Sequence, residues 1–195
     1  MKIPAFITVR TGSTRLPQKC LLPFGDGNVL EHVIKRAKHF GYDPIICTTI
    51  LSEDDVIKNI AKKLHCKCYR GSVDDISKRL KGACNKFGIE SFFPIEADDL
   101  FFLDYARLHH IYIGDWRDSA EGYKDCVNQI RLTLDYPEDY WLLCTVLRCL
   151  GHYATENEIV DLFKRNPDLY KINWFRQKDY EENQECKLRE LDTPA

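Results

Sequence analysis

Apolar and polar positions along the 195-residue chain follow two periods that alternate. Short runs rich in β-branched and aromatic residues predict buried strands, and stretches with apolar residues three and four positions apart predict amphipathic helices. The predicted strands span 3–9, 44–50, 67–69, 91–95 and 129–134, and the predicted helices span 29–40, 52–64, 74–87, a segment that starts at 135–139 and a segment that ends at 164. Because strands and helices alternate, we expect a three-layer α/β sandwich with a mostly parallel sheet.

Several ends of the predicted helices carry recognisable signals. Ser52 is a candidate N-cap, and Thr155 with Glu158 forms a capping-box pattern. Gly41 and Gly88 follow predicted helices, where a glycine readily adopts the left-handed conformation that ends a helix. These signals support the helix boundaries inferred from the periodicity.

The length of the chain suits one domain, which we expect over residues 1–174. Within it, residues 114–125 are polar and weakly patterned, and they predict a loop. Residues 175–195 are strongly charged, so we expect a mobile C-terminal tail there.

Charge balance and cysteine usage narrow the classes of function. The formal net charge is −2, which leaves no basic field of the kind that nucleic-acid binding needs. The nine cysteines are odd in number and form no paired CxxC units, which favours reduced thiols over a zinc site. The first apolar run is too short for a secretion signal, and no stretch approaches the roughly 20 apolar residues of a membrane span. We therefore expect a cytoplasmic protein that binds neither nucleic acid nor membrane.

Three polar clusters each follow a predicted strand directly. They are residues 10–19, termed here the cationic loop, the acidic stretch 96–99, and Asp135. In open parallel sheets, ligands bind beyond the carboxyl ends of the strands. We therefore expect the three clusters to converge on one edge of the sheet.

The cationic loop combines residue types that suit a polyphosphate. Its cations are Arg10, Arg15 and Lys19, and Gly12 and Ser13 are small. Backbone amides at glycine approach phosphate oxygens closely, arginine binds them in bidentate fashion, and lysine acts as a point charge. The spacing is not that of a GxxxxGK[ST] loop. A phosphate site is one interpretation of this loop, and a solvated basic turn is the other.

A set of sequence segments carries a resemblance to a known family. The segments are RTGSTRLPQK at 10–19, LEHVI at 30–34, YRGSVDD at 69–75, RLTLDYPED at 131–139 and NPDLYKIN at 166–173. In this order they resemble elements of the acylneuraminate cytidylyltransferase family, and most of all its spore coat polysaccharide biosynthesis branch. The resemblance implies a Rossmann-like fold of the nucleotide-diphospho-sugar transferase type and a role in the biosynthesis of polysaccharides of the cell envelope.

The resemblance also implies roles for individual residues. The triphosphate of CTP would be held by Arg10, Ser13, Arg15 and Lys19, with Gly12 allowing close approach of the backbone, while Arg70 and Arg79 would lie near the cytidine, and Asp98 and Asp135 would hold Mg²⁺. Arg10 and Lys19 would be the catalytic cations that stabilise the departing pyrophosphate.

The implied reaction is an in-line displacement at the α-phosphorus of CTP. An oxygen of a small acidic or phosphorylated acceptor attacks, pyrophosphate leaves, and no covalent enzyme intermediate forms. Magnesium would polarise the phosphate oxygens and neutralise developing charge. The partners implied are therefore CTP and a small-molecule acceptor, with a homodimer as one option for the assembly.

The chain departs from the family pattern in several places. The segment between Asp98 and Asp135 is much shorter than in the relatives, where it supplies most of the acceptor pocket and often a dimer contact. This favours a small phosphorylated or phosphonate acceptor over a nine-carbon sugar acid. Ala97 and Gln18 stand where the family has glycine, and Leu100 stands where proline is common. A methyl group at Ala97 could crowd a metal or a phosphate.

Two other functions stay open at this point. The first is a degenerate domain of the same fold that binds the nucleotide without turnover. The second is a metal-dependent glycosyltransferase that uses the related sandwich, an alternative that leaves the cationic loop unexplained.

Several of these residues also have purely structural explanations. Asp98 could be a solvated loop acid, and Asp135 could cap the helix that it precedes. Asp54 and Asp55 are predicted to be acids of a first helical turn. His109 and His110 lie in a candidate amphipathic helix and are also candidates for contacts with the acceptor. Trp116, Trp141 and Trp174 are predicted to be packing residues rather than platforms for base stacking.

Overall fold

The computed structural model describes residues 2–101 and 130–192 of the chain. Within this part, four strands form the main sheet, namely β1 (Ile3–Thr8), β4 (Tyr42–Thr49), β5 (Lys67–Gly71) and β6 (Phe93–Glu96). They are ordered β5-β4-β1-β6, and every neighbouring pair runs parallel. The register places Ile7 beside Ile46 on one side and Ile95 on the other. The predicted mostly parallel sheet is therefore confirmed.

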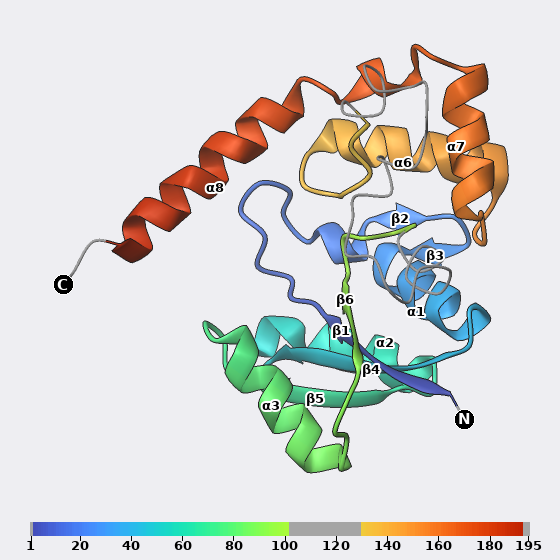
Figure 1. Ribbon diagram of the computed structural model, residues 1–195. Coiled ribbons are helices and arrows are strands. Elements are labelled where there is room, and N and C mark those ends of the chain that lie inside the picture. The colour runs from blue at the N-terminus through green and yellow to red at the C-terminus, as the bar shows by residue number, and fades with distance from the viewer. Residues whose placement is uncertain (1, 102–129, 193–195) are drawn as a thin grey trace.

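Helices cover both faces of this sheet (Figure 1). Successive side chains of a strand point to opposite faces, so Phe6 and Ile7 enter different layers of the core. The Ile7 layer receives α1 (Val29–His39) and α2 (Asp55–Lys63), whereas the Phe6 layer receives α3 (Ile76–Phe87) through Ala83. This arrangement confirms the three-layer α/β sandwich.

The C-terminal half of the described chain adds a helical layer beside the hairpin that precedes α1 (Figure 1). The layer consists of the helices α6 (Pro137–Leu150), α7 (Glu156–Arg165) and α8 (Arg176–Asp192) and the 3-10 turn Leu169–Ile172. The hairpin consists of β2 (Pro23–Phe24) and β3 (Gly27–Asn28), and two further 3-10 turns, Lys19–Leu21 and Ser52–Asp54, lie in the N-terminal part of the chain. Leu142 and Val146 of α6 and Ile159 of α7 are buried in the same core as α1. No helix in the described ranges is long and apolar enough to cross a membrane.

A buried arginine ties this helical layer to α1. Arg36 is fully buried and donates hydrogen bonds to the carbonyl oxygens of Phe101, His152 and Ala154 at 3.2, 3.0 and 2.7 Å. Backbone carbonyls in a loop have no ladder partners, so a side chain with a fork of donors satisfies several of them at once. Arg36 thereby fixes the loop before α7 against the end of the β6 segment.

The predicted helix-end signals at Thr155, Gly41 and Gly88 are confirmed. The Thr155 hydroxyl accepts from the Glu158 amide at 3.3 Å, and the Glu158 carboxylate accepts from the Thr155 amide at 2.8 Å. Gly41 and Gly88 take positive φ angles of 87° and 66° just after α1 and at the end of α3. The predicted loop 114–125, the two histidines His109 and His110, and Trp116 lie outside the described residues.

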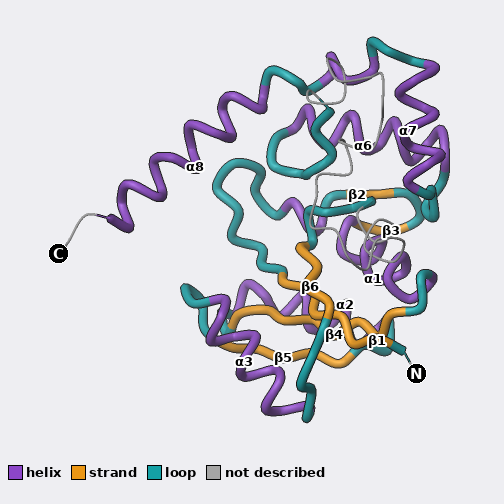
Figure 2. Tube along the Cα trace, viewed as in Figure 1, coloured by secondary structure: helices purple, strands orange, loops and turns teal. Residues whose placement is uncertain are grey.

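The predicted strand 129–134 is wrong in its described part. Residues 130–136 run as irregular backbone in Figure 2. Their backbone is attached to the β6 segment by a single bond, from the Leu134 amide to the Asp98 carbonyl at 3.2 Å. The side chain of Arg131 bonds to Asp135 and Asp139 instead, and such local side-chain bonds give the segment a fold other than a ladder.

Two other expectations also need correction. Ser52 does not cap α2, because Ser52–Asp54 forms a 3-10 turn without a side-chain cap and Asp54 turns into the protein interior. Residues 176–192 of the predicted mobile tail form the helix α8, whose Arg176 pairs with Glu138 of α6. Trp141 and Trp174 are 58% and 46% exposed, so neither is a buried packing residue.

Candidate functional site

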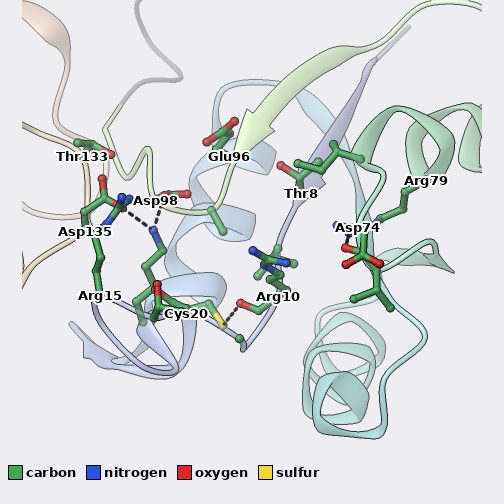
Figure 3. Close-up of a pocket in the computed structure, with 18 of the residues that line it drawn as sticks. Thr8, Arg10, Arg15, Cys20, Asp74, Arg79, Glu96, Asp98, Thr133 and Asp135 are labelled. Atoms are coloured by element: carbon green, nitrogen blue, oxygen red, sulfur yellow. Dashed lines mark hydrogen bonds and ion pairs between the residues drawn. The ribbon is translucent and has the colours of Figure 1, made fainter. Parts of the chain in front are cut away.

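A cavity of about 480 Å³ opens beyond the carboxyl ends of β1 and β6. In the order β5-β4-β1-β6, the chain extends first to one side of β1 and then returns to the other, so the crevice between β1 and β6 is the topological switch point. The lining side chains come from the cationic loop, the start of α3, the acidic stretch and the segment before α6 (Figure 3). Tyr180 and Gln184 of α8 also line the cavity. The structure therefore brings together the three polar clusters predicted to converge.

The cationic loop wraps around the carbonyl oxygen of Thr11. That oxygen accepts the amides of Ser13 at 2.8 Å and Gln18 at 3.2 Å, so it closes the loop from both ends. Arg10, Gly12, Ser13, Arg15 and Lys19, the residues predicted for the triphosphate, all line the cavity. Within the described residues, the exposed Arg10 guanidinium makes no hydrogen bond or ion pair, which leaves it available to an anionic ligand.

Asp54 holds the cationic loop in place through hydrogen bonds to Thr11, a role that the sequence did not predict. Its fully buried carboxylate accepts five hydrogen bonds, from the amide and hydroxyl of Thr11, both at 2.8 Å, and from Thr48 and Thr49 at the end of β4. Burial alone would raise the pKa of Asp54, but these bonds favour the charged form and lower it. Asp54 thus joins β4 to the cationic loop without lining the cavity.

Lys19 lies between the two aspartates predicted to bind metal. Its ammonium contacts the carboxylate of Asp98, the carboxylate of Asp135 at 3.1 Å, and the carbonyl oxygen of Leu134 at 2.8 Å. Burial opposes the charge of Lys19, but the two carboxylates outweigh it and raise its pKa. Lys19 therefore stays protonated in this site.

Asp135 is the centre of a buried ion-pair network. Besides Lys19, it accepts from Arg15 at 2.5 Å and from Arg131 at 2.8 Å, and Arg131 also bonds to Asp139 at 3.0 Å. Burial would raise the pKa of Asp135, but Lys19 and Arg15 lower it overall. Asp135 is thus ionised at neutral pH, and its charge is matched by three cations.

The carboxylates at the end of β6 crowd one another. Burial, together with the charge of Asp98, raises the pKa of Glu96, and burial with the charges of Asp98 and Glu96 raises the pKa of Asp99 to about 7. The described residues hold no group of three or more side chains arranged to bind a metal. Magnesium, however, commonly uses one or two protein carboxylates and completes its shell with phosphate and water. Asp98 and Asp135, which meet on one ammonium, fit that donor set.

The two arginines predicted to lie near cytidine have different positions. Arg79 of α3 is buried, lines the cavity, and donates to the carbonyls of Ser72 and Val73 at 2.8 and 3.0 Å. Burial and the neighbouring Arg10 lower its pKa. Arg70 does not line the cavity, because its guanidinium holds the chain after β4 through the carbonyls of Thr49 and Leu51.

Comparison with known proteins agrees with this geometry. A family model described as cytidylyltransferase matches residues 5–101, which carry the cationic loop, Asp54, Arg79 and Asp98. Residues 5–101 are therefore similar to the cytidylyltransferase family. The match ends before Asp135 and before α8, so the cavity is shared between the cytidylyltransferase segment and residues outside it.

Individual relatives extend the comparison. The chain is 36% identical over 101 residues to an uncharacterized protein of Methanocaldococcus jannaschii, a match that covers 51% of this chain and 42% of that protein. The chain therefore spans less than half the length of this curated relative. A solved cytidylyltransferase from Leptospira borgpetersenii has a similar fold, with a TM-score of 0.70 and 23% identity over 87% of this chain and 97% of that one. A CMP:2-keto-3-deoxy-manno-octonic acid synthetase complexed with CTP aligns over 55% of this chain and 48% of that one, with 21% identity and a TM-score of 0.42.

Sequence reasoning missed several residues of the site beside the cytidylyltransferase segment. Thr133, Tyr180 and Gln184 line the cavity, and Arg131 holds Asp135. Arg131 lies four residues before Asp135 and eight before Asp139, a charge spacing that could have indicated an internal ion-pair network. No comparable signal exists for α8, because its position against the cavity depends on tertiary packing.

Proposed function

We propose that this chain is a CTP-dependent cytidylyltransferase that transfers CMP from CTP to a small acidic or phosphorylated acceptor and releases pyrophosphate. One observation carries the proposal. Lys19 of the cationic loop meets Asp98 and Asp135 inside one cavity, at the switch point of a sheet whose segment 5–101 is similar to the cytidylyltransferase family.

The cations of the cavity are suited to a triphosphate. Arg10 and Arg15 present guanidinium groups on one loop, and Gly12 leaves the backbone open to close approach. Arg10 and Lys19 would stabilise the charge that grows on pyrophosphate as it leaves, while Arg79 lies on the α3 side of the same cavity. Binding would draw Lys19 from the carboxylates toward phosphate oxygens.

Asp98 and Asp135 are the residues that would hold Mg²⁺. When bound there, magnesium would polarise phosphate oxygens and neutralise charge in the transition state. The two carboxylates have a second task, because they keep Lys19 charged and oriented across the cavity. An acceptor that is already anionic needs no strong base, so the chain's own contribution is positioning and charge.

The proposal also includes the subfamily, the biological role, the acceptor and the assembly that the sequence resemblance implies. The resemblance of the sequence segments favours the acylneuraminate cytidylyltransferase family and its spore coat polysaccharide branch. The protein would then act in the biosynthesis of envelope polysaccharides, and it would do so in the cytoplasm. The acceptor would be a sugar acid, a phosphosugar or a phosphonate. A homodimer stays one option for the assembly.

The first experiment is a thermal-shift screen with the four ribonucleoside triphosphates, each with and without Mg²⁺. We expect CTP with Mg²⁺ to raise the melting temperature most. Pyrophosphate release is then measured against phosphomonoesters, phosphonates and acidic sugars. Equal shifts with all four triphosphates, or no shift with CTP, would contradict the proposal.

Replacing Lys19 tests the phosphate role directly. Lys19→Ala is expected to weaken CTP binding at least tenfold more than CMP binding, because only the triphosphate reaches the cationic loop. Calorimetric titrations of both nucleotides measure the difference, with the exposed Lys58→Ala of α2 as the matched control. An equal loss for CTP and CMP would show that Lys19 does not bind the phosphates.

A non-catalytic, nucleotide-binding domain is the second candidate function. Ala97 lines the cavity beside Asp98, at a position where the family has glycine. On this alternative, CTP stabilises the protein but no acceptor gives product, and Ala97→Gly restores pyrophosphate release. Turnover by the unmodified chain would eliminate the alternative.

A further inference from the structure

Two side chains of α8 complete the cavity on the side away from α3. Tyr180 and Gln184 lie four residues apart, so they share one face of the helix, and both line the cavity together with Thr133. None of these three polar side chains forms a hydrogen bond to any other residue in the described ranges. Neutral polar groups that line a cavity and have no hydrogen-bond partner in the protein are suited to orient a polar ligand.

Thr133, Tyr180 and Gln184 form one wall of the cavity, termed here the α8 wall, and contacts from neighbouring segments hold it in place. Arg176 donates to both carboxylate oxygens of Glu138 at 3.0 Å, which fixes the start of α8 on α6. The Tyr180 ring lies against the guanidinium of Arg131 at 4.6 Å and that of Arg15 at 5.5 Å. Figure 1 shows α8 running from the helical layer past the loop that follows β1. The α8 wall is therefore a fixed part of the site.

The family match separates the two sides of the cavity. The cationic loop and Arg79 lie inside residues 5–101, the segment that is similar to the cytidylyltransferase family. Thr133, Tyr180 and Gln184 lie outside that segment. The feature common to the family is the cytidine nucleotide. Of the cavity residues outside the segment, Asp135 is engaged by Lys19 and Arg15, so Thr133, Tyr180 and Gln184 are the ones placed to contact the second substrate.

The charges near the α8 wall indicate the chemistry of that substrate. Arg15 lines the cavity beside Tyr180 and bonds to Asp135 through Nη2 alone. Its other N–H groups can therefore serve an anionic group of the acceptor as well as the triphosphate, at the boundary between the two ligands. The carboxylate of Asp135 is already matched by Arg15, Lys19 and Arg131, so an ammonium group on the substrate would find no free carboxylate there. The phenol, amide and hydroxyl of the wall instead suit hydroxyl groups.

We infer that Tyr180 and Gln184 of α8, together with Thr133, form the acceptor subsite, and that the acceptor is a small hydroxylated anion. The inference rests on the proposed transfer of CMP and specifies its second substrate. The anionic group of the acceptor faces Arg15, and its hydroxyl groups bond to the α8 wall.

Binding to the full chain tests this subsite without turnover. The protein is first saturated with Mg²⁺ and the α,β-methylene analogue of CTP, whose P–C bond prevents transfer, and is then titrated by calorimetry. The probes are glycerol 3-phosphate, D-gluconate and phosphoethanolamine, which separate a phosphate source, a carboxylate source and an aminated comparator. We expect at least one hydroxylated probe to bind at least tenfold more tightly than phosphoethanolamine. Failure of both hydroxylated probes, or equal binding of the aminated one, would overturn the inference.

Three variants locate the bound probe. Tyr180→Phe and Gln184→Leu each remove hydrogen-bonding groups with little change of shape, and each is expected to weaken the hydroxylated probe at least fivefold while nucleotide affinity stays within twofold. Glu182→Gln, an exposed position on the opposite side of α8, is the matched control and should bind like the unmodified chain. Unchanged probe binding in both variants, or a parallel loss of nucleotide, would overturn the inference. Loss of nucleotide binding by the unmodified chain would instead refute the proposed function.

Discussion

At the scale of the residue, Gln18 is one of two non-glycine residues in the described ranges, with His65, that have a positive φ angle. Its φ of 53° and ψ of 29° lie in the left-handed region, at the point where the cationic loop turns into the 3-10 turn Lys19–Leu21. A residue with a Cβ atom is disfavoured there, and glycine is not. The glycine of the related family at this position therefore has a conformational reason.

Replacing Gln18 by glycine should stabilise the protein. The relief of left-handed strain, roughly 1–2 kcal/mol, is partly offset by the greater freedom of glycine in the unfolded chain, so a net gain of about 0.5–1 kcal/mol is expected. Urea unfolding measures the change. Gln18→Ala keeps the Cβ atom and is the control, and an equal gain in both variants would contradict the conformational explanation.

A second residue-scale feature is the neutral, buried His32 of α1. Its two ring nitrogens lie 2.9 Å from His152 Nδ1 and 3.1 Å from the carbonyl oxygen of Leu100. Burial, with the charge of Arg36 nearby, lowers the pKa of His32 to about 3, although the Leu100 carbonyl acts in the opposite direction. In the unfolded chain the same group protonates near its ordinary pKa of 6.5.

This difference predicts a loss of stability in acid. Between pH 6.5 and pH 3 the unfolded state binds one more proton than the folded state, so the free energy of unfolding falls by about 1.4 kcal/mol for each pH unit below 6.5. Urea unfolding at several pH values measures the slope. His32→Gln should make it shallower by one proton, and parallel profiles of the two proteins would show that His32 does not titrate as described.

At the scale of the element, the cationic loop is shaped by contacts with Asp54 at a helix start, a residue that does not line the cavity. Asp54, just before α2, bonds to Thr11, and Thr11 in turn accepts the amides of Ser13 and Gln18. The loop geometry is thus set from β4 and α2 as well as from its own sequence. An exposed loop gains a defined shape when its backbone groups have buried partners.

Asp54→Asn should disturb this loop more than the fold. The amide group places a donor against the Thr11 or Thr49 donors, at an expected cost of about 1–3 kcal/mol. We expect CTP affinity to fall about tenfold and CMP affinity to change little, as measured by calorimetry. The neighbouring Asp55→Asn, an exposed carboxylate paired with Arg70, is the control. Equal CTP affinity in both variants would remove the positioning role.

At the scale of the whole molecule, one buried arginine joins segments that are distant in sequence. Arg131 bonds to Asp135 and Asp139 at 2.8 and 3.0 Å and to Gln177 of α8 at 3.3 Å. Asn173 adds bonds at 2.8 Å to the Arg131 carbonyl and to Asp139. The network connects the segment before α6 to the segment that leads into α8, and so positions the α8 wall.

Removing the arginine should destabilise the whole chain. Arg131→Ala removes the buried guanidinium that pairs with both Asp135 and Asp139, and the expected cost is about 3–5 kcal/mol in urea unfolding. Arg176→Ala, which breaks a more exposed pair between α8 and α6, is the control and should cost about 1 kcal/mol or less. Similar losses in the free energy of unfolding of the two variants would show that the buried network stabilises the chain no more than the exposed pair does.

Much of this protein follows from local sequence. The periods of apolar residues determined the strand and helix order up to β6, and Gly41, Gly88 and the Thr155 capping box determined the ends of three helices, because these effects act over a few residues. The polar clusters at 10–19 and 96–99 were recognisable for the same reason. Their convergence could be expected from the topology of a parallel sheet alone.

Tertiary structure decided the partners of each group. The pairing of Lys19 with Asp98, 79 residues away, and of Arg15 with Asp135, 120 residues away, depends on how the layers pack. So do the inward turn of Asp54, the irregular path of residues 130–136 and the docking of α8. Side chains of similar chemistry, such as Arg70 and Arg79, differ only in what surrounds them after folding, and no period or motif in the chain contains that information.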